Sequence, residues 1–276
     1  MGYVEKDGET RLIKSVDHVK IEVRDLTAAS KSWSSLLGKV PDQIFTDSLA
    51  GRKGMRFSLQ RGAIELIEGE QNVLKALAFI CADLRSASLE FHERGLKTGP
   101  LKTSELVSAR GESCIQTSCE VYPSHRRGKF ITLVERSKPS WASLKNFSKV
   151  LCLDHVVVKT SEPELAKAFY GLGLGLRLPL DETFPQWKAR MMFFRTGGVT
   201  VEVVSSLGDS GQAVDTFWGL AFRVTGISEE HDRLKKAGFI GSDLRSGRKA
   251  GTRVFDLKNA PAGIPTLVIS REQLDG

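Results

Sequence analysis

An internal repeat is the feature that most constrains how this chain folds. The segment that begins at Val16 matches the segment that begins at Leu153, and the match needs no insertion or deletion between its anchor residues. The matched pairs include Asp17 with Asp154, His18 with His155, Trp33 with Tyr170, Met55 with Met192 and Glu65 with Glu202. A repeat of this length indicates that the chain is built from copies of one supersecondary unit.

A second pair of repeats fills the remainder of the chain. Leu77-Ala78-Phe79 matches Leu220-Ala221-Phe222, and both segments end in Thr-Leu-Val, at Thr132 and at Thr266. Each of the four segments has the pattern of an apolar strand, a helix of about three turns and three further strands. The predicted fold class is therefore α+β, with four βαβββ modules.

The third segment shows the pattern most clearly. Its first strand is predicted over Cys152 to Val158, and Ser161-Glu162-Pro163 is typical of a helix start. Leu165, Phe169 and Leu172 are spaced as the apolar stripe of that helix, which we expect to end at the glycines that follow. Its last two strands are predicted over Ala189 to Phe194 and Val199 to Val204.

Composition excludes several classes of protein. With 276 residues, of which 41% are hydrophobic and 26% charged, the chain can form ordinary folded domains. No apolar run is long enough to span a membrane and the first residues are charged, so we expect a cytoplasmic protein. The net charge of +7 is scattered rather than clustered, which argues against nucleic acid as a partner. The four cysteines lack CxxC spacing and are expected to be reduced.

The boundary between the two halves is predicted at a polar stretch that contains Lys138-Pro139-Ser140. Residues 1–11 form an N-terminal extension in this prediction. The first domain then covers 12–138, a linker covers 139–150, and the second domain covers 151–272.

Units that open on Asp-His-Val and close on a strand with a central Glu resemble the vicinal oxygen chelate superfamily. That superfamily includes glyoxalase I, methylmalonyl-CoA epimerase, extradiol and hydroxyphenylpyruvate dioxygenases, and bleomycin resistance proteins. The resemblance covers roughly Leu12 to Arg271 and implies two glyoxalase-like domains. It also implies one divalent metal ion (Zn, Fe, Ni, Co or Mn) and no nucleotide cofactor. The implied metal ligands are His18, Glu65, His155 and Glu202.

How the modules pair decides whether these ligands meet. If the first and third modules face each other, within one chain or across a homodimer, the site has two His and two Glu ligands. If neighbouring modules pair, each domain has one His and one Glu, because the second and fourth modules carry no ligand at the matching positions. One such pair is too few for a firm divalent site, since catalytic zinc sites use three protein ligands.

Strand periodicity predicts which side chains share a face with these ligands. Successive side chains of a strand alternate between faces, so His18 is expected to face away from Asp17. The inward set is then His18, Lys20 and Glu65 in the first module. In the third module it is His155, Val157 and Glu202.

A glycine-bracketed basic turn, Gly247 to Arg253, is a further candidate site. Its Arg248, Lys249 and Arg253 could offer cations and backbone N–H groups to a carboxylate or phosphate of a substrate, although a solvated hairpin has the same pattern. If the domains instead bind an aromatic or anionic small molecule without catalysis, Trp33, Trp187, Phe194 and Trp218 could line the cavity, although aromatic residues at these positions could equally belong to the core.

The leading functional hypothesis is a metal-dependent lyase or isomerase of the glyoxalase and epimerase type. It would act on a small 2-oxo, 2-hydroxy or CoA-linked substrate through an enediolate, with Glu65 or Glu202 moving the proton. Two alternatives stay open. One is a non-catalytic small-molecule binding or resistance protein, and the other is a dioxygenase of the extradiol or hydroxyphenylpyruvate type.

Overall fold

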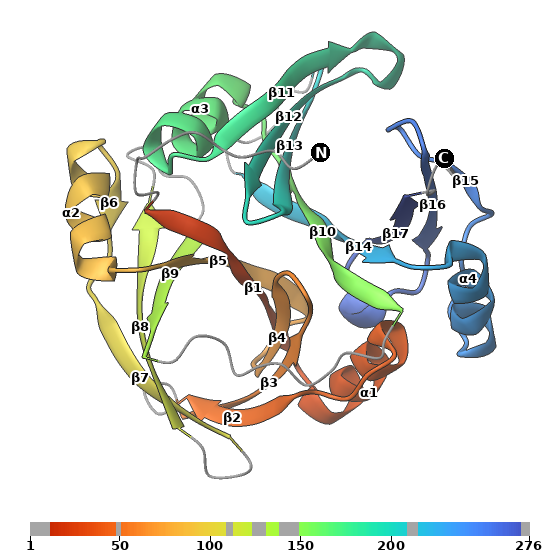
Figure 1. Ribbon diagram of the computed structural model, residues 1–276, viewed down its shortest axis with the longest axis horizontal. Coiled ribbons are helices and arrows are strands. Elements are labelled where there is room, and N and C mark those ends of the chain that lie inside the picture. The colour runs from red at the N-terminus through yellow and green to blue at the C-terminus, as the bar shows by residue number, and fades with distance from the viewer. Residues whose placement is uncertain are drawn as a thin grey trace, which may run out of the picture.

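The computed structural model describes residues 12–47, 51–108, 113–122, 131–137, 149–208 and 215–271. The predicted N-terminal extension and most of the predicted linker lie outside the described residues. Two mixed β-sheets, one in each half of the chain, form the molecule (Figure 1). We call the unit built on the first sheet domain 1 and the unit built on the second sheet domain 2.

Domain 1 contains the first two predicted modules. Its helices are α1 (Leu26–Leu37) and α2 (Leu84–Glu93). Its strands are β1 (Ile13–Val23), β2 (Gln43–Asp47), β3 (Arg52–Ser58), β4 (Ala63–Glu68), β5 (Val73–Cys81), β6 (Lys97–Thr98), β7 (Lys102–Ser108), β8 (Ser113–Tyr122) and β9 (Ile131–Arg136).

Domain 2 contains the other two modules. Its strands are β10 (Val150–Lys159), β11 (Arg177–Phe184), β12 (Ala189–Thr196), β13 (Val199–Ser206), β14 (Thr216–Val224), β15 (Arg245–Ser246), β16 (Thr252–Leu257) and β17 (Thr266–Arg271). Its helical segments are α3 (Pro163–Lys167), η1 (Ala168–Gly173), η2 (Pro185–Trp187), α4 (Ile227–Lys236) and η3 (Pro261–Gly263). The α+β fold class and the four-module organisation are confirmed.

Neighbouring modules pair in both domains. The first strands of modules one and two, β1 and β5, run antiparallel, and β10 and β14 do the same in domain 2. Each first strand also pairs in parallel with the last strand of its own module, as β1 does with β4 and β10 with β13. The first and third modules therefore lie in different sheets, which decides between the two pairing arrangements left open by the sequence.

The sheet of domain 1 closes on itself, whereas the sheet of domain 2 stays open. In domain 1, β2 pairs with β7 and β8 pairs with β9, so the strands β8-β7-β2-β3-β4-β1-β5-β9 form a ring. In domain 2 the order is β11-β12-β13-β10-β14-β17-β16-β15, and no pairing between the described strands joins β11 to β15. Figure 1 shows the ring and the open arc.

The length of one strand accounts for this difference. The closing strand β7 of domain 1 has seven residues, while its counterpart β15 has only two. The sequence around β15, Gly241-Ser242-Asp243 and then Gly247, is rich in residues that are depleted in strands. A two-residue strand offers too few hydrogen bonds to reach and hold β11.

The helices begin and end at recognisable capping residues. The Asp25 carboxylate accepts a hydrogen bond from Ala28 N at the start of α1, and Asp83 accepts one from Ser86 N at the start of α2. Gly38 ends α1 with a φ of 64°, in the left-handed region that favours glycine.

The helix of the third module differs from its prediction. A five-residue α3 continues into the π-helical segment η1, and the wider turn changes which side chains face the sheet. Phe169 and Tyr170 are buried, whereas Leu165 and Leu172 are exposed. The predicted apolar stripe of Leu165, Phe169 and Leu172 is therefore wrong at two of its three positions.

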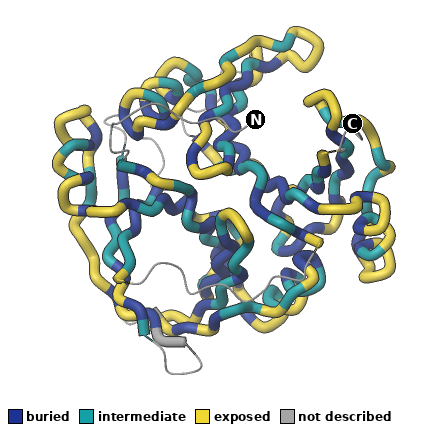
Figure 2. The backbone as a smooth tube through the Cα atoms, viewed as in Figure 1, coloured by how far each residue is buried: buried dark blue, intermediate teal, exposed yellow. Residues whose placement is uncertain are grey.

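The two domains share one hydrophobic core. Trp33 of α1 packs edge-on against Phe222 of β14, with ring centroids 6.1 Å apart, and Gly173 of η1 lies against Leu96 of domain 1. The backbone adds hydrogen bonds from Gln60 N to Leu151 O and from Leu153 N to Arg61 O. Buried residues are concentrated along the strands and where the domains meet, while hairpin tips are exposed (Figure 2).

An ion pair on α4, between a buried glutamate and a partly exposed arginine, also connects the domains. Glu230 is fully buried and pairs with Arg233, whose guanidinium donates to Ser35 O and Leu36 O at the end of α1. These are carbonyls of the last helical turn, where a cation is favourable.

Candidate functional site

The two Asp-His pairs lie on matching β-bulges. The register between β1 and β5 shifts between Val16 and His18, which leaves Asp17 as the extra residue, and the register between β10 and β14 shifts in the same way around Asp154. Each bulge brings the aspartate to the side of its histidine. The prediction that His18 faces away from Asp17 is therefore wrong, because strict alternation does not continue through a bulge.

In domain 1 the bulge builds a buried His-carboxylate pair. The Nδ1 atom of His18 lies 2.5 Å from the Asp17 carboxylate, so Nδ1 carries the proton. Burial lowers the pKa of His18, which keeps the ring neutral and leaves a lone pair on Nε2. That atom has no hydrogen-bond partner in the described structure and lies 3.5 Å from the Glu65 carboxylate.

Three cations from different strands surround these carboxylates. Arg56 Nη1 lies 3.3 Å from both Asp17 and Glu65, and Lys20 Nζ lies 3.6 Å from Glu65. Arg136 binds Asp17 and also donates to Gln116 Oε1. The interior of domain 1 is therefore a network of buried ion pairs.

The network changes the ionisation of its carboxylates. Burial alone would raise the pKa of Glu65, but His18, Lys20 and the two arginines outweigh burial and lower it to about 2. Arg56, His18 and Arg136 hold the pKa of Asp17 well below its usual range despite burial.

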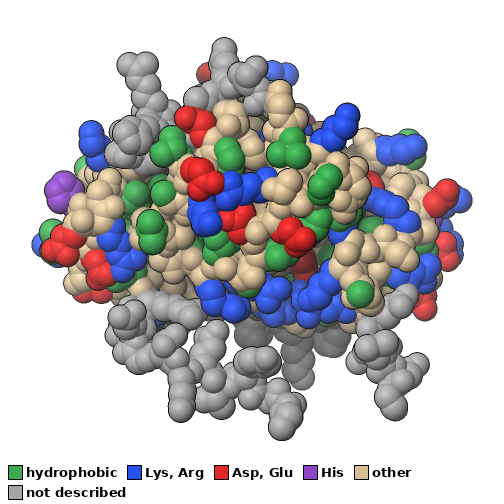
Figure 3. Space-filling view, turned by 90° about the horizontal axis from the view of Figure 1, so that it is seen from above, with side chains coloured by type: hydrophobic (Ala, Val, Ile, Leu, Met, Phe, Trp, Pro, Cys, Tyr) green, Lys and Arg blue, Asp and Glu red, His purple; other side chains and the backbone are tan. Residues whose placement is uncertain are grey.

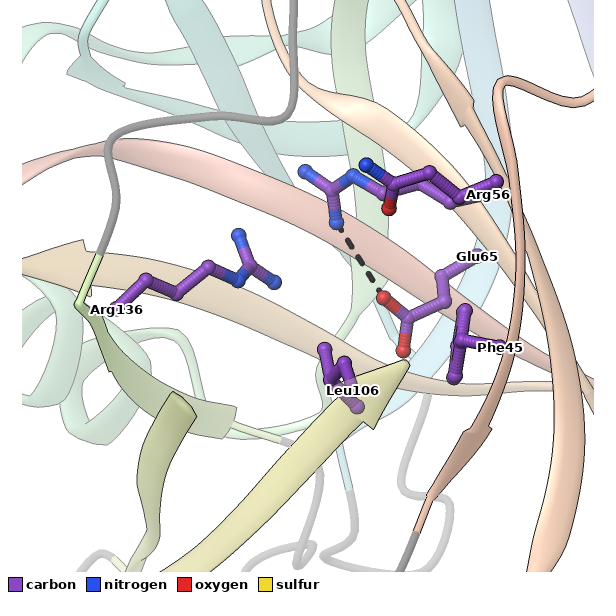
Figure 4. Close-up of a pocket in the computed structure, with 6 residues that line it drawn as sticks. Phe45, Arg56, Glu65, Leu106 and Arg136 are labelled. Atoms are coloured by element: carbon purple, nitrogen blue, oxygen red, sulfur yellow. Dashed lines mark hydrogen bonds and ion pairs between the residues drawn. The ribbon is translucent and has the colours of Figure 1, made fainter. Parts of the chain in front are cut away.

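These side chains leave little free space inside the ring of strands. The central pocket is lined by Gln43, Phe45, Arg56, Glu65, Leu106 and Arg136. Arg56 and Arg136 point toward Glu65 from opposite sides (Figure 4). The Phe45 ring also lies over Gly54, where a Cβ atom would come within 2.4 Å of it. Room remains for about one water molecule, as expected for an eight-stranded barrel filled by its own side chains.

Domain 2 carries the same His and Glu residues on its inner face, by which we mean the face of its sheet that bears His155. His155 Nδ1 lies 3.1 Å from the Asp154 carboxylate and Nε2 lies 3.5 Å from Glu202. Arg223 also binds Asp154. Burial opposes ionisation of Asp154, but His155 and Arg223 lower its pKa to about 2.

The basic turn between β15 and β16 reaches across the open sheet. The Arg248 guanidinium lies 4.3 Å from the ring centroid of Trp187, which belongs to η2 near the opposite end of the sheet. Arg248 also lies 3.7 Å from Glu202, and Trp187 stacks on Phe184 at 4.8 Å. The Arg248 side chain is 55% exposed, so water reaches this contact.

The two domains differ most at the positions beside the shared glutamates. In domain 1, Glu65 pairs in register with Arg56 on β3 and with Lys20 on β1. At the repeat-matched positions of domain 2, Glu202 pairs with Phe193 and Val157. The built-in cations of domain 1 are therefore replaced by apolar side chains in domain 2.

Neither site fits a divalent metal ion. The residues opposite the two histidines on the neighbouring strands are Ala78 and Ala221, which have no ligand atom. Within the described residues, no group of three or more His, Cys, Asp and Glu side chains is placed to hold a metal. In domain 1, moreover, Lys20 and Arg56 already neutralise Glu65. A His and a Glu alone fall short of the three protein ligands of a typical catalytic site.

The predicted four-ligand set is therefore split between two domains. His18 and Glu65 are 1% and 2% exposed inside domain 1, in a different sheet from His155 and Glu202 of the same chain. The composite site is wrong for this structure.

The predicted substrate-binding residues divide into two groups. Trp187, Arg248 and Lys249 lie around the inner face of domain 2. Phe194 is fully buried in the core against Tyr170, with ring centroids 5.4 Å apart. The pair Val254 and Ile269 lies on the inner face. Arg253 pairs with Ser270, which is the next pair along the strands, so Arg253 points to the opposite face.

Several residues of the two sites were not among the sequence candidates. Arg56, Arg136, Arg195, Arg223 and Arg271 each stand alone in an ordinary strand sequence. The repeat contained one sign that Arg56 differs from its surroundings. Arg56 lies between Met55 and Phe57, whereas the matching residue between Met192 and Phe194 is Phe193. The repeated aspartate before each histidine was a second signal.

Comparison with known proteins agrees with this fold. Residues 154–255, which lie in domain 2, match the family described as the Glyoxalase/Bleomycin resistance protein/Dioxygenase superfamily. No curated protein sequence matches the chain.

Solved structures of similar fold cover nearly the whole chain. A mutant of 4-hydroxymandelate synthase from Streptomyces coelicolor has a TM-score of 0.64 and 15% identity, over 96% of this chain and 94% of that one. The 2,3-dioxygenase LapB from Pseudomonas sp. KL28 has a TM-score of 0.64 and 12% identity, over 96% and 94%. 2,2',3-Trihydroxybiphenyl 1,2-dioxygenase from Sphingomonas wittichii strain RW1 has a TM-score of 0.60 and 15% identity, over 95% and 91%. At these identities the likeness concerns the fold alone.

The described residues also contain no helix with the length and apolar character needed to cross a membrane.

Proposed function

We propose that this chain, a tandem member of the vicinal oxygen chelate superfamily, binds a small organic molecule on the inner face of domain 2 without a bound metal ion. The observation that carries the proposal is the contrast at the matched glutamates. Domain 1 fills its interior with Lys20, Arg56 and Arg136, whereas domain 2 has an open sheet and, among its described residues, only the exposed Arg248 as a cation beside Glu202.

The groups around the open sheet suit a ligand with a planar apolar part. Trp187 is 39% exposed and presents a flat surface that is already stacked on Phe184. Arg248 lies over that ring and can donate to an acceptor on a ligand. His155, held at Nδ1 by Asp154, directs Nε2 toward the same face.

Metal content is the first test of this proposal. We expect purified protein to hold far less than one equivalent of divalent metal after expression with added Zn, Fe, Ni, Co or Mn. His18→Ala and His155→Ala should leave that content unchanged. About one equivalent of metal that is lost in His155→Ala would overturn the proposal and restore the predicted metalloenzyme.

Ligand binding is the second test. Benzoate, phenylpyruvate, lactate and succinate can be titrated while the fluorescence of Trp187 is followed, with Trp187→Phe to identify its share of the signal. We expect at least one aromatic acid to change the emission in the wild type. The change should weaken in Arg248→Ala and persist in the matched control Arg245→Ala, which removes an exposed arginine of the neighbouring strand β15. No response from any acid would count against the inner face as the binding site.

The Asp154–His155 pair favours a second candidate, an isomerase or lyase that moves a proton without a metal. An imidazole whose Nδ1–H is held by a carboxylate can accept a proton at Nε2, and Arg248 could stabilise a developing enolate. Proton NMR in D₂O tests this directly. Exchange of the C–H beside the carbonyl of phenylpyruvate, accelerated by the wild type and not by His155→Gln, would establish proton transfer, and equal rates with both proteins would exclude it for this substrate.

A further inference from the structure

Three cations lie around one end of the inner face of domain 2. Arg195 on β12 pairs in register with Thr200, which in turn pairs with His155. Arg271 ends β17 and pairs with Thr252 on β16. Both positions share the inner face, because side chains two residues apart on a strand point the same way and paired residues lie side by side.

The third cation, Lys249, comes from the basic turn. Thr252 fixes this turn, because its backbone N donates to Lys249 O at 3.2 Å and its hydroxyl donates to the same oxygen. Lys249 therefore lies directly before β16, whose residue Thr252 pairs with Arg271.

Lys249 lies close enough to Arg271 and to Arg195 to be repelled by both. Arg271, then burial and then Arg195 lower the pKa of Lys249 below its usual value. Asp154 acts in the opposite direction and only partly offsets them. Like charges held together in this way are relieved by an anion placed between them.

The nearby carboxylates are already engaged. Asp154 is bound by His155 and Arg223, and Glu202 has His155 at 3.5 Å and Arg248 at 3.7 Å. Arg195, Lys249 and Arg271, in contrast, have no ion-pair partner within the described residues. All three side chains are exposed, so a solute can reach them.

We propose that Arg195, Lys249 and Arg271 form an anion site for the doubly charged end of the ligand, a phosphate or a pair of carboxylates. The inference rests on the proposed function, because it supplies the second half of a ligand whose planar part lies against Trp187. Two guanidinium groups and an ammonium group match the several oxygens of such an anion.

The placement favours a small molecule over a polyanion. The three cations come from the inner face of one sheet and the turn above it, rather than from an extended outer surface. In the view of Figure 3, Lys and Arg side chains lie among Asp and Glu over the middle of the face, and a row of them lies along its lower edge. A nucleic acid would instead need a continuous basic surface.

Calorimetric titration of the full chain at low ionic strength tests the site. The probes are inorganic phosphate and malonate, with the singly charged acetate for comparison. We expect phosphate or malonate to bind the wild type, and the double variant Lys249→Gln/Arg271→Gln to bind at least about tenfold more weakly. Lys236→Gln, on the exposed part of α4, is the matched control and should bind like the wild type. Phosphate binding alone would identify a phosphate monoester as the ligand class, and malonate binding alone a dicarboxylate.

The result also separates this inference from the proposed function. If Trp187 responds to an aromatic acid and the double variant still binds phosphate and malonate normally, the anion site is wrong while the proposed function stands. If phosphate binding depends on Lys249 and Arg271 but no organic acid affects Trp187, the planar part of the proposed function fails. No heat from either dianion in the wild type, or equal weakening in Lys236→Gln, would overturn the anion site.

Discussion

Domains 1 and 2 are built from the same βαβββ modules and carry matching Asp, His and Glu residues, yet the surroundings of these residues differ. In domain 1 the ring of strands is closed and Arg56 lies in register with Glu65. In domain 2 the sheet is open and Phe193 occupies the matching position beside Glu202. The His-Glu pair by itself therefore does not define a site.

The difference shows that the same Glu can be neutralised inside one domain by the protein's own cations and lack them in the other. A guanidinium and an ammonium group neutralise Glu65 as a metal or substrate cation would, and they fill the space as well. Domain 2 lacks these groups at its centre and carries its cations at the edge of the sheet instead. We expect domain 1 to contribute stability and domain 2 to contribute binding.

The largest effect should come from breaking the buried network of domain 1. Arg56→Ala leaves Asp17 and Glu65 without their shared partner in a buried environment, which should destabilise the protein by about 3–5 kcal/mol. Urea denaturation followed by circular dichroism measures the change. Arg223→Ala, which removes the matching partner of Asp154 in the open domain, should cost only about 1–2 kcal/mol. Equal costs would remove the distinction between the domains.

The stability of the protein at low pH should also depend on the buried network of domain 1. The pKa of Glu65 falls from its ordinary 4.5 to about 2 in the folded state, so its ionised form contributes about 3 kcal/mol of stability above pH 4.5. That contribution is lost as the pH falls from about 4.5 to about 2, because the unfolded chain takes up the proton first. The melting temperature should fall more steeply across this pH range in the wild type than in Glu65→Gln. The exposed Glu68→Gln on the same strand should follow the wild type, and a wild-type slope in Glu65→Gln would argue against the network.

A smaller effect should test whether the domains unfold together. Arg233→Ala leaves the buried Glu230 unpaired and removes two hydrogen bonds to α1, a loss of about 2–3 kcal/mol. If the shared core couples the domains, the variant should still unfold in a single transition, with its midpoint at a lower denaturant concentration. The appearance of two transitions would show that this contact, more than the core, joins them.

The smallest effect should be at the rim of domain 2. Arg248 is mostly exposed, so Arg248→Ala should change the unfolding free energy by less than about 0.5 kcal/mol. The same variant should alter the fluorescence of Trp187, because the guanidinium no longer lies over the ring. A stability loss as large as that of Arg56→Ala would place Arg248 in a structural role and weaken the proposed function.

Much of the fold could be predicted because the repeat is a property of the sequence itself. The spacing of His18 and Glu65 and of His155 and Glu202 gave the strands that carry them, and the capping Asp25 lies where a helix start is expected. The orientation of Asp17 could not be predicted, since a one-residue bulge leaves no mark in apolar periodicity. The exposure of Leu172 was missed for a similar reason, because it lies in a π-helical turn that changes the period locally.

The sequence predicted several residues of the candidate site, but it did not predict how they are arranged in space. The sequence by itself determined the four modules, the matched His and Glu residues and the basic turn at Arg248, since each is a local pattern. Only the tertiary structure decided that neighbouring modules pair, that β7 closes one sheet while β15 leaves the other open, and that Arg56 lies against Glu65. Those outcomes depend on contacts between residues far apart in the chain, and no local pattern of charge or hydrophobicity specifies such contacts.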